Sequence, residues 1–429
     1  MWTVSMICVC AAGLLQGAAE PARPTTDQAA WQDMELGMFI HIAPNTWQDA
    51  EGDQRNTPLE KINPSALDTE QWVQVAESMG AKYIVFVAKH VGGFCMWQTD
   101  TTDYGIKNTP WKDGKGDVLG DLSASCRDHG IKLGVYLCPR DDAHDVGDSG
   151  RCRDASQQEK YDAIYRQQLT EVLSRYGEMA EVWFDGSNIV EAGDILKQYA
   201  PHAAIFQGKY ASIRWVGNED GKAPYPAWNA VSRDAWRRGA TAKDGDPNGD
   251  VWLPNECDAR MRRDWFWNSK NAKTLKSVDR LMDMYYESVG RGAVLLLNAT
   301  PDTTGLIPEG DVKRAEEFGA EIQRRFGRSI AETDGSGDTV MLDLGGAKRI
   351  DHAVTMEDIL QGERIRAYVI EGRSNGAWTT LSEGTAVGHK KIDRFKPAEV
   401  DAVRLRVTQS ADSPIVRKLA VYCADAKGN

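Results

Sequence analysis

Asp185 is the residue of this chain whose position most directly suggests chemistry. It follows the apolar segment Val182-Trp183-Phe184 and precedes Gly186, which predicts a strand that delivers a carboxylate to a loop. A carboxylate beside an apolar strand is costly to bury unless something uses it. An Asp in this position also commonly caps a helix or a turn, so the rest of the chain must decide between a cap and a catalyst.

Further residues that can bind a ligand lie where other predicted strands end. Short apolar runs predict strands over residues 36–40, 83–88, 132–137, 182–185 and 294–297. Polar or aromatic side chains stand at or near the ends of four of them: His41, His90, Tyr136 and Asp185. Four such groups at four strand ends are hard to explain as separate structural accidents, so the pattern favours one shared site.

Amphipathic helices alternate with these strands from about residue 30 to residue 327. Asp68-Thr69-Glu70-Gln71 resembles a capping box, and Trp72, Ala76 and Met79 follow at helical spacing. Strand–helix alternation predicts an α/β fold with a parallel sheet. At this length we expect a (β/α)8-like TIM barrel over residues 30–327, whose active site lies at the C-terminal ends of the strands.

Two carboxylates at the mouth of a barrel suggest glycoside hydrolysis, in which one attacks the anomeric carbon and the other protonates the leaving oxygen. Asp185 is the candidate nucleophile. Two residues compete for the role of the acid: Glu219, in Arg214-Trp215-Val216-Gly217-Asn218-Glu219, and Glu256, in Pro254-Asn255-Glu256. Either one could equally be a surface carboxylate or the partner of an arginine, and spacing alone does not choose between them.

Histidine and tryptophan side chains suit a sugar ring, because they combine polar atoms with flat apolar faces. We expect His41 and His90 to donate hydrogen bonds to sugar hydroxyls. Of the 14 tryptophans, six could line the pocket: Trp97, Trp183, Trp215, Trp252, Trp265 and Trp267. We expect half of these six to belong to the core instead. Trp97, Trp183 and Trp265 are the ones predicted to contact the substrate. The spacing of the His and Cys residues does not suggest a metal site. The sequence also contains no glycine-rich phosphate loop that would indicate an organic cofactor.

The sequence texture changes after about residue 328. Asp334-Gly335-Ser336-Gly337 reads as a linker, and the segments that follow alternate apolar and polar residues with period two, as in Val403-Arg404-Leu405-Arg406-Val407. No long helical pattern remains. We therefore expect an all-β sandwich domain over residues 335–425.

The first 20 residues are apolar and carry no acidic or basic side chain before Glu20, which predicts a secretory signal peptide cleaved near Ala19 and a secreted or periplasmic protein. No stable membrane span is expected. A disulfide between Cys138 and Cys152 would suit an exported protein, although the sequence does not establish one. The net charge of −12 argues against a nucleic-acid partner. The sequence makes no prediction about oligomeric state.

Taken together, the segments of the predicted barrel resemble the glycoside hydrolase family 29 α-L-fucosidases. The resemblance covers nearly the whole barrel, and its segments are specific only as a set. They include Met38-Phe39-Ile40-His41, Gly93-Phe94-Cys95-Met96-Trp97, Gly134-Val135-Tyr136-Leu137, Glu181-Val182-Trp183-Phe184-Asp185-Gly186, Gly217-Asn218-Glu219, Trp265-Phe266 and Leu295-Leu296-Leu297-Asn298.

This resemblance implies a retaining exo-α-L-fucosidase that acts through a covalent glycosyl-enzyme on a fucosylated glycan, with Asp185 as the nucleophile. The segment that ends at Glu219 is similar to the branch that prefers α-1,3/1,4-linked fucose, and it implies that Glu219 is the acid/base and Glu256 a substrate contact. Residues matching positions that hold the fucose ring are His41, His90, Tyr136, Trp183 and, more weakly, Arg214.

The chain departs from the family at Val91-Gly92, where the family usually reads His-Asp. A polar contact to the sugar is lost there, and sites built around a hydroxyl discriminate strongly when its partner changes. Two alternatives therefore stay open: a glycosidase for a related L-sugar such as α-L-galactose, and a carbohydrate-binding protein without catalysis. The C-terminal segment resembles discoidin-like, galactose-binding-like modules, which implies either glycan binding or simple packing on the barrel.

Overall fold

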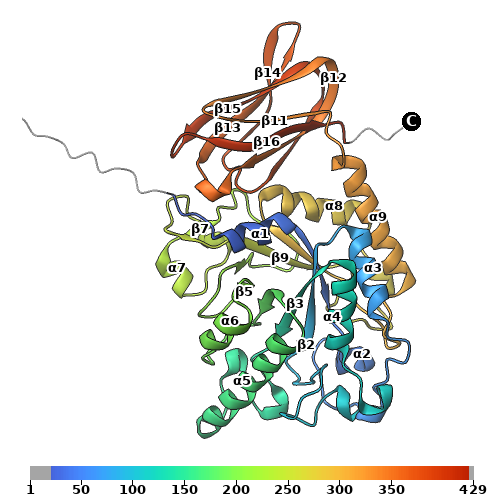
Figure 1. Cartoon of the computed structure of the whole chain (residues 1–429). Coiled ribbons are helices and arrows are strands. Elements are labelled where there is room, and N and C mark those ends of the chain that lie inside the picture. The colour runs from blue at the N-terminus through green and yellow to red at the C-terminus, as the bar shows by residue number, and fades with distance from the viewer. Residues whose placement is uncertain (1–20, 425–429) are drawn as a thin grey trace, which may run out of the picture.

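Eight parallel strands form the barrel of the computed structural model, which describes residues 21–424 (Figure 1). Their order is β5-β4-β3-β2-β1-β10-β9-β6, and a parallel bridge between Phe206 and Ile213 brings the two edges together. The predicted (β/α)8-like architecture is confirmed. The strands are β1 Leu36–Ile40, β2 Tyr83–Lys89, β3 Lys132–Leu137, β4 Met179–Trp183, β5 Ala204–Phe206, β6 Arg214–Trp215, β9 Asn255–Arg260 and β10 Val294–Asn298.

Helices surround this sheet on its outer face (Figure 1). Local sequence sets their limits: the Asp117 side chain accepts a hydrogen bond from the Gly120 N–H at the start of α4, and Gly130 ends that helix in the left-handed conformation. The helices of the barrel are α1 Thr26–Met34, α3 Thr69–Met79, α4 Val118–His129, α5 Gln158–Arg175, α6 Gly193–Tyr199, α8 Val278–Glu287 and α9 Glu309–Phe326, with a short α2 at Pro44–Gln48.

One side of the barrel lacks a regular covering helix. Only residues 207–213 separate β5 from β6, and they contain no helix. The connection from β6 to β9 is longer and carries a two-stranded ribbon and one short helix, namely β7 Ala230–Val231, α7 Arg233–Arg237 and β8 Val251–Trp252. The outer surface next to β5 and β6 is therefore bordered by loops.

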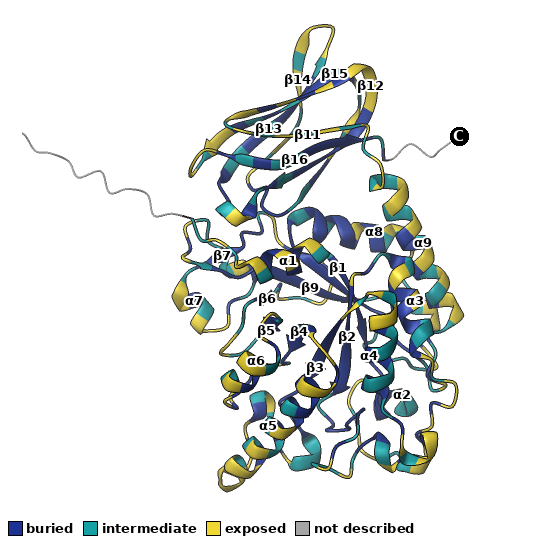
Figure 2. Ribbon diagram, in the orientation of Figure 1, coloured by how far each residue is buried: buried dark blue, intermediate teal, exposed yellow. Residues whose placement is uncertain are grey.

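The strands are buried on both faces, as Figure 2 shows for the centre of the barrel. One apolar cluster fills the layer between sheet and helices, where Trp72 of α3 stacks on Phe86. A second cluster fills the barrel itself and is mainly aromatic: Phe39, Tyr83, Tyr136, Trp183 and Phe206 are among its members. Large rings inside the barrel leave no open channel.

Gly37 makes room for one of these rings. A Cβ atom at Gly37 of β1 would lie 2.4 Å from Cζ of Tyr83, which is fully buried. The tyrosine ring therefore packs directly against the backbone of the neighbouring strand. Its hydroxyl is thereby held inside the barrel, where it donates to Glu256 Oε2 at 3.4 Å.

The second domain is an antiparallel sheet of six strands, in the order β11-β16-β12-β15-β13-β14, which confirms the all-β prediction. The strands are β11 Ala331–Ser336, β12 Thr339–Glu357, β13 Ile365–Ser374, β14 Ala377–Gly384, β15 Lys391–Ser410 and β16 Ile415–Tyr422. Register shifts interrupt the long pair β12–β15, and an apolar cluster that includes Ile350, Val403 and Leu405 forms the core.

The linker prediction for residues 334–337 is wrong, because Asp334 to Ser336 belong to β11, in which Gly335 and Ser336 pair with β16. A register shift between Thr333 and Gly335 explains the glycine in this strand. Cys138 and Cys152 are free, buried thiols, so the suggested disulfide is absent. The signal-peptide prediction concerns residues 1–20, which lie outside the described residues. Over residues 21–424, no helix has the length and apolar character needed to cross a membrane.

The β domain packs against the N-terminal ends of the barrel strands. His389 Nε2 lies 2.8 Å from Oδ1 of Asp33, just before β1, and Ile392 contacts Gly290, just before β10. Residues of both domains share one apolar cluster, in which Ile392 and Tyr422 join the barrel side chains. The β domain therefore lies at the opposite end of the barrel from the C-terminal strand ends (Figure 1).

Replacing Gly37 by alanine is expected to lower the free energy of unfolding by about 1–3 kcal/mol, because the added Cβ overlaps the Tyr83 ring. Chemical denaturation measures the change. Gly52→Ala is the matched control, since no heavy atom lies within 4 Å of its added Cβ, and it is expected to change stability by less than about 0.5 kcal/mol. Equal effects of the two variants would contradict this packing.

Candidate active site

Asp185 lies two residues beyond the end of β4, half-buried at the C-terminal end of the barrel. The Tyr136 hydroxyl of β3 donates a hydrogen bond to its Oδ2 at 2.9 Å. Burial raises the pKa of Asp185, the Tyr136 hydrogen bond opposes that shift, and the charge of Glu219 adds to it. Because Tyr136 holds Oδ2, the other carboxylate oxygen is the one available to attack.

His41 and His90 lie beside Tyr136. The His90 ring stacks on the Tyr136 ring at 5.7 Å, and the two histidine rings meet edge-on at 6.0 Å. Burial lowers the pKa of His90 to about 4 and holds the pKa of His41 well below its usual range. Both imidazoles are therefore neutral near pH 7.

The tautomer of His41 follows from its neighbour Asn298. Asn298 Nδ2 donates to the Trp265 carbonyl at 2.9 Å, so its Oδ1 is the atom 2.9 Å from His41 Nδ1. An amide oxygen only accepts, so Nδ1 carries the hydrogen and Nε2 is left as an acceptor. His41 thus offers an acceptor to a substrate hydroxyl, rather than the donor expected from the sequence.

Glu219 stands in the loop that follows β6, and two side chains hold one of its oxygens. Arg260 Nη2 and Trp265 Nε1 each lie 3.1 Å from Glu219 Oε2, and the guanidinium stacks over the Trp265 ring at 5.0 Å. The side chain is 43% exposed. Within residues 21–424, no hydrogen bond or ion pair holds its Oε1, which suits a group that passes a proton to and from a substrate.

Glu256 lies beneath this site rather than in it. It is fully buried at the start of β9, where its Oε1 accepts from Trp183 Nε1 at 2.7 Å. Burial and the neighbouring carboxyl of Glu181 raise its pKa well above the usual range, and burial raises the pKa of Glu181 to about 7. The pair therefore carries less than its full negative charge near neutral pH.

Trp183 links this buried pair to the nucleophile. Its indole stacks on Phe206 at 3.8 Å on one side and on Tyr136 at 5.3 Å on the other. It is 5% exposed, so it forms part of the base of the pocket. The hydrogen bond to Glu256 fixes the plane of this ring, and the ring in turn supports the tyrosine that binds Asp185.

Two predicted contacts lie elsewhere. Trp97, predicted to line the pocket, is fully buried between sheet and helices, where its Nε1 donates to Glu171 of α5 at 3.0 Å. Arg214 is buried at the start of β6, where its Nε donates to Asn255 at 2.8 Å and its Nη2 to the Trp228 carbonyl. Neither residue contacts Asp185 or Glu219.

Sequence reasoning missed Arg260 as a site residue, because it ends a strand that was not predicted. The six residues of β9 read Asn-Glu-Cys-Asp-Ala-Arg, a polar run without the apolar signal of a buried strand. For Asn298, the sequence predicts only that it follows a strand. The adjoining Leu295-Leu296-Leu297 run correctly places it at the C-terminal edge of the sheet, but no sequence signal indicates its hydrogen bond with His41.

The loop that carries Asp53 lies beside the unusual Val91-Gly92 segment. A Cβ atom at Gly92 would lie 2.3 Å from Oδ2 of Asp53, so the Asp53 carboxylate occupies the space beside this glycine. The Tyr104 hydroxyl donates to the same Oδ2 at 2.7 Å. Val91 packs against the apolar cluster inside the barrel, so it presents an apolar surface where the family has histidine.

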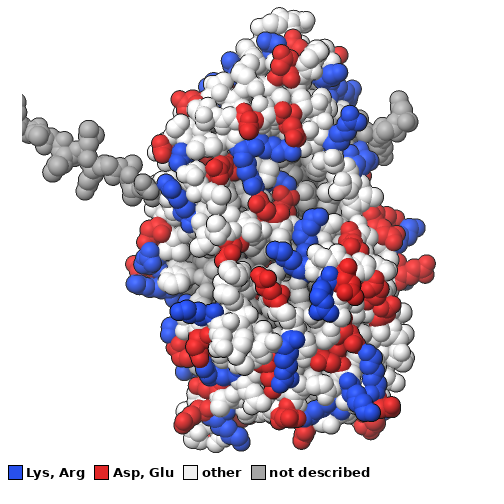
Figure 3. Space-filling view, in the orientation of Figure 1, with Lys and Arg blue, Asp and Glu red and all other residues white. Residues whose placement is uncertain are grey.

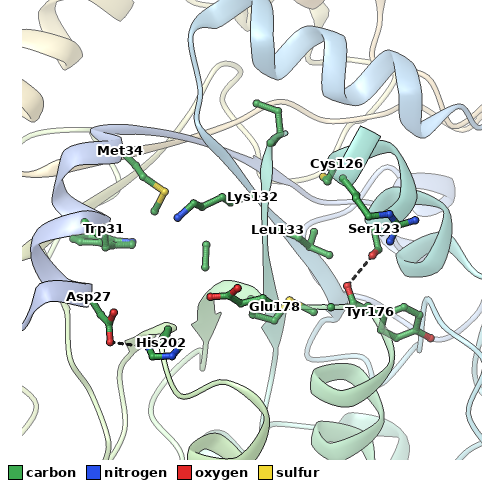
Figure 4. Close-up of a pocket in the computed structure, with 16 residues that line it drawn as sticks. Asp27, Trp31, Met34, Ser123, Cys126, Lys132, Leu133, Tyr176, Glu178 and His202 are labelled. Carbon is green, nitrogen blue, oxygen red and sulfur yellow. Dashed lines mark hydrogen bonds and ion pairs between the residues drawn. The ribbon is translucent and has the colours of Figure 1, made fainter. Parts of the chain in front are cut away.

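A separate cavity of about 380 Å³ lies at the other end of the barrel, near the starts of β3 and β4. Figure 4 shows Lys132, Glu178 and Trp31 around it, together with the Asp27–His202 pair. Barrel enzymes carry out their chemistry at the C-terminal ends of the strands, so this cavity is not the catalytic one. Within residues 21–424, no group of three or more His, Cys, Asp or Glu side chains is arranged to hold a metal ion.

Comparison with known proteins identifies the family. The sequence profile of the family described as alpha-L-fucosidase matches residues 53–325. Alpha-L-fucosidase 1 of Arabidopsis thaliana is 31% identical over 457 residues, which cover 95% of this chain and 88% of the plant protein. The chain belongs to the α-L-fucosidase family.

Solved structures agree with this assignment. A putative α-L-fucosidase from Bacteroides thetaiotaomicron superposes with a TM-score of 0.88 at 34% identity, over 95% of this chain and 100% of the other. A family 29 fucosidase from Ruminococcus gnavus, solved in complex with fucose, superposes with a TM-score of 0.82 at 28% identity, over 96% and 97% of the two chains. The protein is a glycoside hydrolase with α-L-fucosidase activity.

Tyr136→Phe is expected to lower kcat/KM about tenfold or more and to move the acid limb of its pH profile upward. The variant removes the hydrogen bond that lowers the pKa of Asp185, and a hydrogen bond to a charged group is worth about 1.5–3 kcal/mol. A pH series of kcat/KM measures both effects. Tyr165→Phe is the control, because its hydroxyl binds the Leu137 carbonyl instead, and an equal shift in this variant would contradict the assignment.

The difference in unfolding free energy between the wild type and Glu181→Gln is expected to depend on pH. Because the folded-state pKa of Glu181 is about 7 against an ordinary 4.5, the folded protein binds the extra proton between these values. The stability contributed by Glu181 is therefore fully present below pH 4.5 and is lost as the pH rises to about 7. Denaturation of both proteins between pH 4.5 and 8 measures this slope, and a slope of opposite sign would refute the buried neutral carboxyl.

Proposed function

We propose that the protein is a retaining exo-α-L-fucosidase that cleaves terminal α-linked L-fucose through a covalent intermediate on Asp185. The observation that carries this proposal is the pair of differently held carboxylates. Tyr136 fixes one oxygen of Asp185, while Arg260 and Trp265 fix one oxygen of Glu219. The charge of Glu219 also raises the pKa of Asp185, so the two carboxylates are close enough to interact.

In the first step, the oxygen of Asp185 that Tyr136 does not hold attacks the anomeric carbon and the glycosidic bond breaks. Glu219 gives its proton to the departing oxygen, which leaves as a hydroxyl group of the glycan. In the second step, Glu219 takes a proton from water, and the oxygen of that water displaces Asp185 from the sugar. Both carboxyl groups return to their starting states, and two inversions retain the anomeric configuration.

The remaining polar groups suit the fucose ring. His41 Nε2 is a neutral acceptor and His90 is neutral beside it, so both can bind sugar hydroxyls without adding charge. The Arg214-to-Glu219 segment supports a preference for α-1,3 or α-1,4 linkages, because it is similar to the branch of the family with that preference. The apolar N-terminal segment supports export to the periplasm or the medium.

A second candidate substrate is a related L-sugar such as α-L-galactose. The Val91-Gly92 segment motivates it, because the polar contact that a histidine would make to the sugar is absent there, and Asp53 reaches this region from a different loop. The sugar preference of this pocket is thus set by a different combination of groups.

Two assays test the proposal. One measures release of 4-nitrophenol from the α-L-fucoside and the α-L-galactoside, and the other measures release of fucose from a Lewis-type oligosaccharide. We expect the fucosyl substrates to be cleaved and Asp185→Asn to reduce turnover by at least about 10³-fold with unchanged folding. Azide is expected to restore part of the activity of Asp185→Ala by attacking the anomeric carbon in the vacated space. Full activity of Asp185→Ala would refute the nucleophile, and preference for the galactoside would establish the second candidate.

Glu219→Gln is expected to slow hydrolysis of a natural fucosyl linkage far more than hydrolysis of the 4-nitrophenyl fucoside. A good leaving group needs little help from an acid, so the gap between the two substrates reports on proton donation. Glu256→Gln is the matched comparison, since its carboxyl lies beneath the pocket, and it is expected to affect both substrates equally. The reverse pattern would make Glu256 the acid.

A further inference from the structure

A cavity of about 920 Å³ lies on the side of the barrel that lacks a covering helix. The loop between β5 and β6, residues 207–213, forms one wall, and α7 with the residues after it forms another. Its lining includes Ser187 to Ile189, which directly follow Asp185 and Gly186. The backbone N–H of Ser187 donates to Gln207 Oε1 at 3.0 Å, which ties the nucleophile loop to this wall.

The same cavity reaches the side of the acid. Trp215 and Thr241 line it, and they also line a neighbouring pocket formed by Val216, Gly217 and Asn218, the residues that lead to Glu219. The acid protonates the oxygen of the leaving group, so the leaving sugar must lie on the Glu219 side of the fucose. The cavity is bounded by the loop that follows Asp185 and adjoins the pocket of the loop that leads to Glu219, so it is placed to receive that sugar.

The charge of this cavity is opposite to that of the protein. The chain carries 63 Asp and Glu against 51 Lys and Arg, and both kinds intermingle on the face shown in Figure 3. Four lining residues of the cavity are basic and none is acidic: Lys209, Arg214, Arg237 and Arg238.

Two of these cations lack a carboxylate partner in the described part of the chain. Lys209 pairs with Glu191 at 2.6 Å and Arg237 lies 3.9 Å from Asp234, whereas neither Arg214 nor Arg238 makes an ion pair within residues 21–424. Arg214 is 2% exposed, and its Nη1 is buried without any hydrogen-bond partner among these residues.

An unpaired buried cation is unfavourable unless a ligand completes it. Burial lowers the pKa of Arg214 to about 10, so it remains charged near neutral pH. The carboxylates of Glu363 and Asp244 act on it only through space. The guanidinium therefore borders the cavity as a charge whose Nη1 makes no hydrogen bond with the described part of the protein.

Apolar surface accompanies this charge. Ile189 and Tyr210 are 40% and 37% exposed, which makes them two of the most exposed large hydrophobic residues, and both line the cavity with Trp236. Aromatic and aliphatic faces of this kind pack against sugar rings, while arginines bind sulfate and carboxylate groups. The combination is that of a site for an acidic sugar.

We propose that this cavity binds the leaving group of the substrate and selects one that carries an anionic substituent, either a sulfate ester or a sugar carboxylate. Arg214 and Arg238 bind the anion, and Tyr210 and Trp236 contact the ring. This inference rests on the proposed fucosidase function and adds the class of glycan on which it acts.

The test compares kcat/KM for three disaccharides in which fucose is linked to galactose, galactose 6-sulfate or galacturonate. We expect one anionic disaccharide to be preferred about tenfold or more over the neutral one, because it accepts charge-assisted hydrogen bonds that the neutral sugar cannot accept. The preference is expected to shrink as salt is raised. The sulfate and carboxylate substrates separate the two sources of charge.

Arg238→Gln and Arg214→Gln are expected to abolish that preference. Arg233→Gln is the matched control, because Arg233 begins helix α7, which ends just before Arg238, and it pairs with Asp250 and does not line the cavity. This variant is expected to keep the preference. Equal kcat/KM for all three substrates, or a preference that persists in Arg238→Gln and Arg214→Gln, would overturn the proposal.

Calorimetric titration with free galactose 6-sulfate, galacturonate and galactose separates this proposal from the proposed function. If the 4-nitrophenyl fucoside is not hydrolysed, the fucosidase proposal fails, whereas binding of an anionic sugar that is lost in Arg238→Gln would still support the anion site. Binding of galactose as tight as that of both anionic sugars would overturn the anion site regardless of catalysis.

Discussion

The hydrogen bond from Trp183 Nε1 to the buried Glu256 supports the rest of the catalytic end of the barrel. It fixes an indole that packs between Phe206 and Tyr136, and Tyr136 in turn binds Asp185. A buried carboxylate would normally be too costly. Here two acidic groups, Glu181 and Glu256, lie together inside the barrel. Burial raises the pKa of both, and the charge of Glu181 raises the pKa of Glu256 further. The protein thereby positions its nucleophile from beneath through polar groups that carry little charge.

The two domains divide the work between support and catalysis. The β domain contacts the N-terminal end of the barrel, where Glu363 accepts hydrogen bonds from the backbone and side chain of Asn229. Arg366 stacks over the adjacent Trp228 ring at 4.8 Å, and the carbonyl of Trp228 binds Arg214. The β domain thus supports the segment that holds the basic cavity, and it does so without reaching the catalytic mouth. This arrangement explains why its strands pack on the barrel with polar as well as apolar contacts.

Most of the barrel could be predicted from sequence because its strands are apolar runs that end in polar residues. Asp185, His41, His90 and Tyr136 were placed at the mouth by that rule, and the structure brings them together. The rule failed for β9, because the buried residues of this strand are polar and form hydrogen bonds, as Glu256 does with Trp183. It therefore missed Arg260 at the end of the strand. The prediction for Trp97, which was based on its flat aromatic ring, is wrong because such a ring packs equally well between sheet and helices, where Glu171 binds it.

The most direct test of the account is covalent trapping of the intermediate. A 2-deoxy-2-fluoro-L-fucosyl fluoride slows hydrolysis of the glycosyl-enzyme, so the sugar stays attached and can be located by mass spectrometry of proteolytic peptides. The account predicts one labelled site, at Asp185, and no labelling in Asp185→Asn. Labelling at Glu219 or Glu256, or turnover of fucosides with inversion and without a trapped intermediate, would contradict it.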